Sequence, residues 1–191
     1  LAEHFTLGFV GSLKPWHGVE QLVDAFVMFH QRHDDAHLAI VGDGPLKKTL
    51  VRKRKEAGRA RKRIHLVGGV SPQEVPAWLT SITVAVAPYP ALPDFYFSPL
   101  KLYEYMAAGR AVVASHIGQM RSVLRHGING LMYAPGDVAG LAERFSHLYE
   151  DRNLTQRLGI SARETMLDGH SWEQTLDRIL AAALPSHIAV C

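Results

Sequence analysis

Residues 7–41, LGFVGSLKPWHGVEQLVDAFVMFHQRHDDAHLAIV, decide the fold class of this chain. The stretch begins and ends in short apolar runs, 7–10 and 38–41, which are typical of strands covered on both faces. Between these runs, apolar side chains recur every three or four positions and form one stripe along a helix. They are Val19, Leu22, Val23, Phe26 and Phe29. The stretch therefore predicts a strand, a helix and a second strand parallel to the first.

The remainder of the chain repeats this alternation. Four more apolar runs are expected strands, at residues 64–67, 84–87, 111–114 and 130–133. Helix-compatible segments lie between and after them, at residues 46–57, 73–79, 99–108, 119–125, 138–149, 154–167 and 172–183. This order of elements predicts an α/β fold: a doubly wound, Rossmann-like parallel sheet of about six strands with helices on both faces. No interior linker or repeat interrupts it, so we expect one domain over residues 1–191.

The composition is that of a packed globular domain. Of the 191 residues, 47% are hydrophobic and 20% are charged, close to globular averages. No apolar run reaches the roughly 20 residues that cross a bilayer, and the first residues lack the pattern of a secretion signal, so we expect a cytoplasmic protein. The single cysteine, Cys191, excludes an intrachain disulfide. Because the chain starts at Leu1 and the first strand follows within a few residues, we expect an upstream part of the natural chain to be missing.

Positive charge is concentrated in residues 47–63, which hold ten of the 21 lysines and arginines and one acid, Glu56. Two interpretations stay open: a solvated, arginine-rich surface, or a contact with anionic lipid or nucleic acid. The stretch lacks interleaved aromatic side chains and any known readout motif, so nucleic acid is the least favoured partner. We expect the stretch to lie on helix and loop surface away from the ligand-binding edge of the sheet, where a peripheral membrane contact has room to form.

The loop after the first strand is a candidate phosphate site, because ligands of an open parallel sheet bind outside the carboxyl ends of its strands. It reads GSLKPWHG and leads into a helix. The N–H groups and the positive end of that helix attract an anion, with Lys14 or His17 as the charged partner. The alternative is that Gly11 and Gly18 serve a tight turn while Lys14 and His17 face water.

The loop after the second strand, residues 42–45 (GDGP), invites comparison with the dinucleotide fingerprint G-x-G-x-x-G. Lys47 stands where the third glycine belongs, and the loop does not follow the first strand, so a nicotinamide or flavin dehydrogenase is disfavoured. Pro45 suits a structural turn at the start of a helix. The histidines form no metal-binding spacing such as H-E-x-x-H, and neither a G-x-S-x-G elbow nor a G-x-x-x-x-G-K-[ST] phosphate loop occurs.

The strongest signal for chemistry lies in residues 98–109, SPLKLYEYMAAG. Ser98 is a good N-cap, Pro99 fits the first helical position, and Gly109 can end the helix in a left-handed conformation. Lys101 then falls in the first turn, where its charge faces the positive end of the helix dipole. That position is unfavourable for a cation unless an anion lies nearby, and a bound diphosphate would supply one.

Glu104 lies one turn further along the same face of this helix. An ionised carboxylate has two acceptor oxygens, which match the adjacent 2′- and 3′-hydroxyls of a ribose. Phosphate at the helix tip and ribose one turn in is the order of groups in a nucleotide, so the pattern predicts a nucleotide site. The alternative is a surface ion pair between Lys101 and Glu104, which would be worth little.

With these residues in view, the chain resembles the C-terminal domain of the retaining glycosyltransferases with the GT-B fold, often called the group 1 family. The resemblance covers nearly the whole chain, from residue 8 to residue 173. Its most specific pieces are residues 98–109 with 112–115 and residues 127–131 with 135–137, supported by residues 40–45 and 67–70. In such enzymes the C-terminal domain binds a nucleoside diphosphate sugar and the N-terminal domain supplies most of the acceptor site. The resemblance therefore implies a donor-binding domain whose N-terminal acceptor-binding partner is absent from this chain.

The resemblance also implies roles for single residues. Glu104 matches the glutamate that binds ribose, the N–H groups of Leu100 and Lys101 match the helix tip that receives the diphosphate, and Val70 falls where the base is held. The donor-binding residues that it implies are Gly11, Ser12, His17, Val70, Asp94, Tyr96, Ser98, Pro99, Leu100, Lys101 and Glu104. Among the residues near the reacting diphosphate, it implies catalytic roles for Lys14, Lys101 and Glu104.

Two departures from the family pattern stand out. The family commonly has an arginine and a lysine in the first loop that grip the diphosphate; those places hold Ser12 and His17, so Lys14 is expected to substitute. The family also has a second glutamate, eight positions before the ribose-binding one, that contacts the sugar. That position is Tyr96, with Asp94 the nearest acid.

The mechanism that the resemblance implies is transfer of a sugar with retention at the anomeric carbon. Helix-end N–H groups and a cation stabilise the departing diphosphate, so no metal or other cofactor is required. Two alternatives remain: a sugar-nucleotide epimerase of related fold, and a nucleotide-binding module without catalysis.

Overall fold

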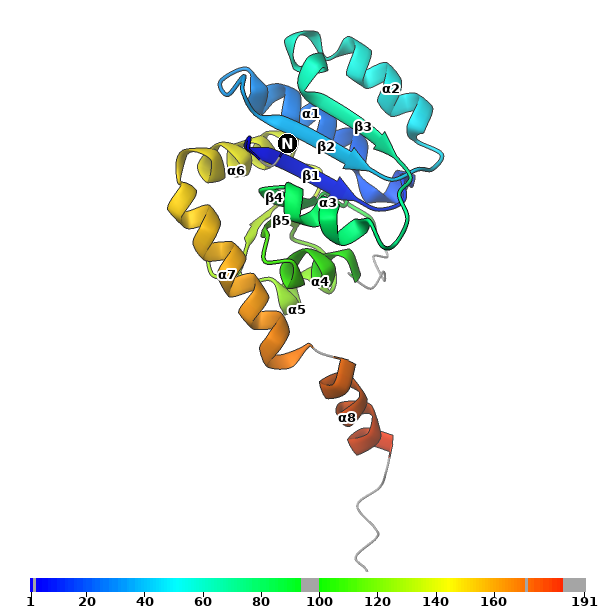
Figure 1. Cartoon of the computed structure of the whole chain (residues 1–191), viewed down its shortest axis with the longest axis vertical. Coiled ribbons are helices and arrows are strands. Elements are labelled where there is room, and N and C mark those ends of the chain that lie inside the picture. The colour runs from blue at the N-terminus through cyan, green and yellow to red at the C-terminus, as the bar shows by residue number, and fades with distance from the viewer. Residues whose placement is uncertain (2, 94–99, 171, 184–191) are drawn as a thin grey trace, which may run out of the picture.

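The structure, a computed structural model, describes residues 1, 3–93, 100–170 and 172–183. Six strands form one parallel sheet in the order β3-β2-β1-β4-β5-β6 (Figure 1). They are β1 Thr6–Val10, β2 His37–Val41, β3 Ile64–Gly68, β4 Val84–Ala87, β5 Ala111–Ser115 and β6 Leu131–Tyr133. The predicted doubly wound α/β fold is confirmed, and each predicted strand lies within about one residue of its expected bounds.

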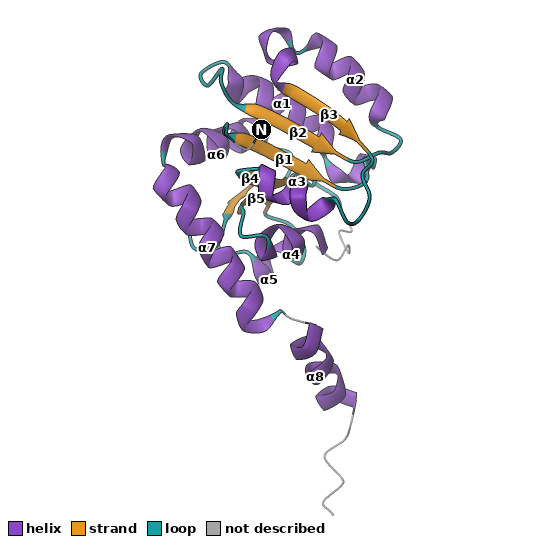
Figure 2. Cartoon of the chain, in the orientation of Figure 1, coloured by secondary structure: helices purple, strands orange, loops and turns teal. Residues whose placement is uncertain are grey.

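Helices cover both faces of the sheet (Figure 2). On one face, the core is formed with α1 (Val19–His30), α2 (Lys47–Glu56) and α6 (Val138–Glu150). On the other, it is formed with α3 (Val75–Ser81), α4 (Leu100–Ala107) and α5 (Met120–Val123). α7 (Arg152–Gly169) contributes to both clusters, and α8 (Trp172–Ala183) follows it at the end of the described chain.

The two faces of the sheet differ in the size of their side chains. Leu7 and Phe9 of β1 belong to the cluster around α1 and α6, whereas Val10 belongs to the opposite cluster. Gly8 faces the same side as Val10, and a Cβ added there would lie 2.4 Å from Cγ2 of Ile82. Any larger residue at this position would collide with a fully buried side chain. β1 therefore packs closely on both faces, as the absence of polar alternation in its sequence predicts.

The helix boundaries follow the local signals closely, with a few differences. Gly109 takes the left-handed conformation, with φ 67°, directly after the last turn of α4, as predicted. Pro45 lies in the turn before α2, two residues ahead of its first residue, Lys47. The predicted helices at residues 73–79 and 119–125 are shifted or shortened to Val75–Ser81 and Met120–Val123. None of the described helices has both the length and the apolar composition that spanning a bilayer requires.

Three histidines gather at the outer edge of the sheet. His37 Nδ1 lies 2.8 Å from His65 Nε2, and Arg63 Nη1 lies 2.9 Å from His37 Nε2. Because a guanidinium only donates, His37 Nε2 must accept, and its proton sits on Nδ1 and is donated to His65. The His4 ring stacks on His37 with centroids 4.7 Å apart. The arrangement requires both bonded imidazoles to be neutral.

We expect this edge to lose stability in mild acid. Burial, with His65, Arg63, His4 and the amino group of Leu1 around the ring, lowers the pKa of His37 from 6.5 to about 4. The unfolded chain therefore binds a proton near pH 6.5 that the folded chain refuses until about pH 4, so the free energy of unfolding falls as pH drops through this window. After a discount for partial exposure, the loss is on the order of 1–2 kcal/mol.

Urea unfolding at pH 7.5 and at pH 5 would measure this loss. The variant His37→Gln should lose less stability than the wild type on acidification, and the control His116→Gln, at an exposed position, should behave like the wild type. Equal losses in the wild type and in His37→Gln would show that the histidine edge does not carry the pH dependence.

Candidate functional site

The candidate site lies where the order of strands reverses, between β1 and β4. In open α/β sheets this topological switch point opens a crevice at the carboxyl ends of the strands, where ligands bind. The loop after β1, the segment after β4 and the first turn of α4 meet here. A Cβ placed on Gly11 would lie 3.2 Å from Cε of Lys101, which brings the first loop and the tip of α4 into contact.

Lys101 rests against aromatic rings rather than in water. Its Nζ donates to the Tyr89 hydroxyl at 3.2 Å and lies 5.1 Å from the ring centroid of Phe9 and 5.0 Å from that of Tyr89. Cation–π attraction and one neutral acceptor hold the ammonium at the mouth of the first loop. The salt bridges of the described residues do not include Lys101. The surface ion pair with Glu104 is therefore not formed.

Burial shifts the pKa of both charged groups on α4. It lowers the pKa of Lys101 to about 8, with an opposing effect from the Glu104 carboxylate. It raises the pKa of Glu104, with an opposing effect from Lys101. Each charged form is thus partly desolvated and stabilised by the other at a distance. An anion bound beside Lys101 would relieve its desolvation and raise its pKa.

Glu104 lies one turn along α4 from Lys101, and part of its side chain is exposed while the rest is shielded from solvent. Its carboxylate borders a pocket of about 550 Å³ between α4 and α8, which Leu100, Tyr103, His170, Thr175 and Arg178 also line. The rings of Tyr103 and His170 pack 5.4 Å apart at one wall. Leu100 is 62% exposed at the helix tip. The carboxylate oxygens of Glu104 are thus available to ligand hydroxyls from outside the helix.

In the first loop, His17 lies inward rather than in solvent. Its Nδ1 is 2.6 Å from the carbonyl oxygen of Ser12, and its ring meets that of Tyr89 edge-on with centroids 5.7 Å apart. A carbonyl only accepts, so Nδ1 carries the proton and Nε2 is the open acceptor of the neutral ring. Burial and the neighbouring Lys101 lower the pKa of His17, so the neutral form prevails at pH 7. One interpretation of the loop makes His17 the charged partner of an anion, but its ring is neutral at pH 7 in the ligand-free domain.

Lys14 and the glycines complete the first loop. Lys14 Nζ lies 5.7 Å from the ring centroid of Trp16, an exposed residue of the 3-10 helix η1 (Pro15–His17). Gly18 has φ 65°, and a Cβ there would lie 1.6 Å from the carbonyl oxygen of Pro88. The glycine thus lets α1 begin directly beside the segment after β4. Gly18 therefore serves the tight turn that the alternative interpretation expects, and anion binding by this loop stays a prediction.

The second loop has the structural role that its turn chemistry predicts. The N–H of Leu13 donates to the carbonyl of Asp43, and the N–H of Leu46 donates to the carbonyl of Leu13. A Cβ on Gly42 would lie 1.9 Å from the carbonyl oxygen of Gly11. The second loop is therefore a support for the first.

Val70 follows β3 on the same edge of the sheet. It is partly buried and packs against the cluster that contains Val10 and Tyr105. The preceding Gly69 would place a Cβ 3.6 Å from the Asp43 side chain, so this third loop adjoins the second. The three loops thus form one continuous edge beside α4. Four implied donor residues lie outside the described residues: Asp94, Tyr96, Ser98 and Pro99.

Two tyrosines at the site were not singled out from the sequence. Tyr89 accepts from Lys101 and is 3% exposed, and burial raises its pKa to about 12. Tyr105 is fully buried on α4, where its hydroxyl reaches the backbone of Val10 in β1. Each contact joins two different elements of the fold, 12 residues apart for Tyr89 and 95 for Tyr105, so no local pattern marks them. The signal that was available for Tyr105 is a hydroxyl at an otherwise apolar position of an amphipathic helix, which needs a partner when buried.

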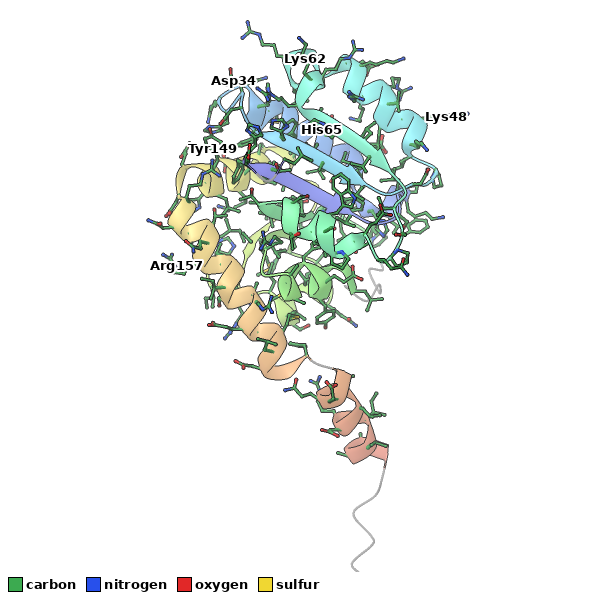
Figure 3. The ribbon with its side chains drawn as sticks, viewed as in Figure 1. Asp34, Lys48, Lys62, His65, Tyr149 and Arg157 are labelled. Carbon is green, nitrogen blue, oxygen red and sulfur yellow. The ribbon has the colours of Figure 1, made fainter. Side chains whose placement is uncertain are left out.

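The basic stretch, residues 47–63, forms α2 and the 3-10 helix η2 (Gly58–Arg63) beside β3. Lys48 and Lys62 lie on its outer side (Figure 3). Lys53 is bonded to both carboxylate oxygens of Asp24, at 2.6 and 2.7 Å. The first residue, Lys47, pairs with Asp43 of the second loop, whereas η2 lies at the other end of α2. Most of the positive charge of this stretch therefore lies at the edge of the sheet that is furthest from β6.

Several curated proteins are similar to this chain. Among curated proteins, the chain is 29% identical to the GDP-mannose-dependent α-(1-6)-phosphatidylinositol monomannoside mannosyltransferase of Mycobacterium tuberculosis, over 91% of this chain and 46% of that protein. It is 31% identical to the phosphatidyl-myo-inositol mannosyltransferase of Mycobacterium leprae, over 92% and 45%. It is 28% identical to the glycogen synthase of Mycobacterium tuberculosis, over 86% and 39%. The chain spans less than half the length of these relatives.

Solved structures share the fold. TarM of Staphylococcus aureus, in a complex that includes UDP, superposes with a TM-score of 0.83 at 18% identity, over 93% of this chain and 35% of that one. HepE of Anabaena, in complex with UDP and glucose, superposes with a TM-score of 0.80 at 22% identity, over 95% and 49%. The family model described as Glycosyl transferases group 1 matches residues 4–151, which is most of the chain. The chain is therefore a member of the group 1 glycosyl transferase family.

Proposed function

We propose that this chain is the donor-binding domain of a glycosyltransferase, which holds a nucleoside diphosphate sugar for transfer to an acceptor with retention. The observation that carries the proposal is the position of Lys101, desolvated at the tip of α4 and in contact with the first loop. A cation kept out of water at a helix start, with no bonded carboxylate among the described residues, is what an anionic ligand would stabilise. Relatives and solved structures that carry mannosyltransferase names or bound UDP support the choice of ligand.

In this proposal the diphosphate lies between the first loop and the tip of α4. The ammonium of Lys101 and the N–H groups at the start of α4 stabilise the negative charge that develops as the diphosphate departs. Lys14 belongs to the same loop as His17, and neutral His17 offers Nε2 to a ligand hydroxyl or takes up a proton beside the anion. The positive charge thus comes from the chain itself, and a divalent metal is not part of the mechanism.

Glu104 supplies the second contact of the proposed site. Its carboxylate accepts hydrogen bonds from the ribose hydroxyls, while Val70 lies on the loop that would hold the base. An acceptor-binding domain, N-terminal to this one in the natural protein, closes the cleft and completes the enzyme. This part of the proposal is supported by the share of the relatives that the chain leaves uncovered, since it spans 46% of the mannosyltransferase at most.

Calorimetry of the chain with UDP, GDP and ADP tests the proposed function. We expect one of the three to bind, and its nucleoside to bind more weakly. Failure of all three to bind would contradict the donor-binding role. Binding without any sugar transfer or donor hydrolysis by the full-length protein would favour the non-catalytic module, and epimerisation of the sugar would favour the epimerase.

We also propose that the protein acts in the cytoplasm at the inner face of a membrane, through the basic surface of α2 and η2. Exposed cations near an anionic bilayer gain about 1 kcal/mol each. Two relatives are named for action on phosphatidylinositol lipids, which supports a lipid surface as the partner. Because Lys53 is paired with Asp24, the exposed cations of this surface are the ones to change.

Co-sedimentation with vesicles tests this attachment. The variant in which Lys48, Arg52, Lys55 and Lys62 are all glutamine should sediment far less than the wild type with anionic vesicles at low salt, and neither should sediment with neutral vesicles. A control with the same change of charge carries glutamine at four exposed arginines elsewhere: Arg121, Arg125, Arg157 and Arg163. If the first variant sediments like the control, α2 and η2 are a solvated surface.

A further inference from the structure

At the switch point, β1 extends two residues beyond the last residue that is paired with β4. The two strands pair at Leu7 with Val84 and at Gly8 with Ala85, whereas β1 continues to Val10. On the other side, β1 stays paired with β2 as far as Val10, and the N–H of Gly11 donates to the carbonyl of Val41. Because the backbone groups of successive strand residues point to alternate sides, Val10 directs its N–H and C=O toward the gap that opens beside β4.

The hydroxyl of Tyr105 fills this gap. It accepts a hydrogen bond from the N–H of Val10 at 2.9 Å and donates one to the carbonyl of Val10 at 2.9 Å. A hydroxyl has one donor and two acceptor lone pairs, so a single group satisfies both backbone atoms. The Tyr105 side chain is fully buried, and burial raises the pKa of its hydroxyl, which therefore stays protonated and able to donate. The two bonds take the place of the missing pairing with β4.

This contact joins the two segments that form the diphosphate site. Val10 directly precedes Gly11 of the first loop, and Tyr105 lies one helical turn after Lys101 on α4. The Lys101 side chain in turn approaches Gly11, as the 3.2 Å from Cε to an added Cβ shows. α4 therefore contacts the end of β1 and the loop after it at two points: Tyr105 bonds Val10, and Lys101 approaches Gly11. A change in the distance between Tyr105 and Val10 would therefore change the distance between Lys101 and Gly11.

We propose that Tyr105 is a positioning residue for the diphosphate, which sets the spacing between the first loop and Lys101 by clasping the end of β1 to α4. The inference rests on the proposed function, because it assigns Tyr105 a part in holding that ligand. Tyr105 does not touch the ligand itself. It acts through Lys101 and the N–H groups of the loop, and charge stabilisation of this kind depends on distance over fractions of an ångström.

The test compares Tyr105→Phe with the wild type for two ligands: the nucleoside diphosphate that binds most tightly among UDP, GDP and ADP, and its nucleoside. We expect the Kd of the diphosphate to rise about tenfold, the scale of one lost hydrogen-bond contribution, while the Kd of the nucleoside changes less than about twofold. A merely structural role would weaken both ligands alike or neither. The control Tyr149→Phe removes a tyrosine hydroxyl on α6 that donates to Asp35 at 2.6 Å, away from the first loop and α4, and should leave both affinities unchanged.

A double-mutant cycle with Lys101→Ala shows whether the effect passes through the lysine. In the Lys101→Ala background, Tyr105→Phe should cost the diphosphate less than about twofold, because the group that it positions is gone. Should Tyr105→Phe fail to fold, Gly11→Ala tests whether that spacing matters, since its methyl group would press on Lys101 Cε and the φ of 151° at this position is one that alanine rarely adopts. It should likewise weaken the diphosphate more than the nucleoside.

The outcomes separate the two proposals. If the wild type binds a nucleoside diphosphate and Tyr105→Phe, or Gly11→Ala in its place, leaves the ratio of the two affinities unchanged, the positioning role is overturned and the donor site stands. If the wild type binds none of the three diphosphates, the proposed function fails and the inference fails with it. If Tyr105→Phe lowers the affinity for the diphosphate relative to the nucleoside, and this effect disappears in the Lys101→Ala background, both proposals are supported.

Discussion

Replacing Lys101 with alanine should weaken binding of a nucleoside diphosphate by about 1.5–3 kcal/mol, the contribution of a hydrogen-bonded charge, and should change binding of the bare nucleoside much less. The ammonium is held at the first loop by Phe9 and Tyr89 and lacks a carboxylate partner among the described residues. Calorimetry with both ligands measures the difference. The loss should shrink at high salt, where charges near the surface are screened.

The same lysine should make diphosphate binding depend on pH. Burial lowers its pKa to about 8 in the free domain, so the ammonium is present below pH 8 and is lost above it. Affinity for the diphosphate should therefore fall between pH 7 and pH 9 in the wild type and stay nearly level in Lys101→Ala. The exposed Lys48→Ala serves as the control and should match the wild type. Equal losses for the diphosphate and the nucleoside in Lys101→Ala would assign the lysine a structural role.

Replacing Glu104 with glutamine should weaken ligands that contain ribose by about 1.5–3 kcal/mol, because the amide trades one acceptor oxygen for a donor. Pyrophosphate, which lacks the sugar, should lose far less affinity in Glu104→Gln than the ribose ligands do. The wild type should also prefer UDP to 2′-deoxy-UDP, or the matching pair for another base, and the variant should lose most of that preference. Isothermal titrations with these ligands decide the assignment.

The control for this substitution is Glu143→Gln, at an exposed position on α6. It removes the same charge from the surface without touching α4. Unchanged affinity for the ribose ligands in Glu104→Gln would remove Glu104 from the ribose site. Glu104 would then be a lining residue of the pocket between α4 and α8 and not a ligand of the ribose.

The course of the chain could be predicted from sequence because each element carries its own local signal. The runs at 7–10 and 38–41 are apolar over their full length, are only four residues long and are followed by turn residues, as is typical of a strand covered on both faces. Gly109 ends α4 in the left-handed conformation that a glycine adopts at low cost. The short helices were placed less well, since Val75–Ser81 and Met120–Val123 have few turns over which a periodicity can show.

The candidate site residues could be singled out one by one, and their ligand roles stay predictions, but their arrangement could not be predicted. Lys101 and Glu104 follow from their positions in a helix of clear bounds. The charge state of His17 does not, because it depends on burial against Tyr89 and on a carbonyl five residues away. Tyr105 bonds a residue 95 positions away along the chain, and only the diverging ends of β1 and β4 create the need for that bond.

The hydrogen bonds among the loops after β1, β2 and β3 bear on how this domain could be re-engineered. Leu13 donates to Asp43, Leu46 donates to Leu13, and Gly42 donates to Gly68, so each loop is bonded to the next. A first loop transplanted from another protein would arrive without the carbonyl and N–H positions that its neighbours need. The transplant would have to bring the second loop with it, including a glycine where Gly42 meets Gly11. We therefore expect that the proposed donor preference can be changed by transplanting the loops after β1, β2 and β3 together, and not by transplanting one of them alone.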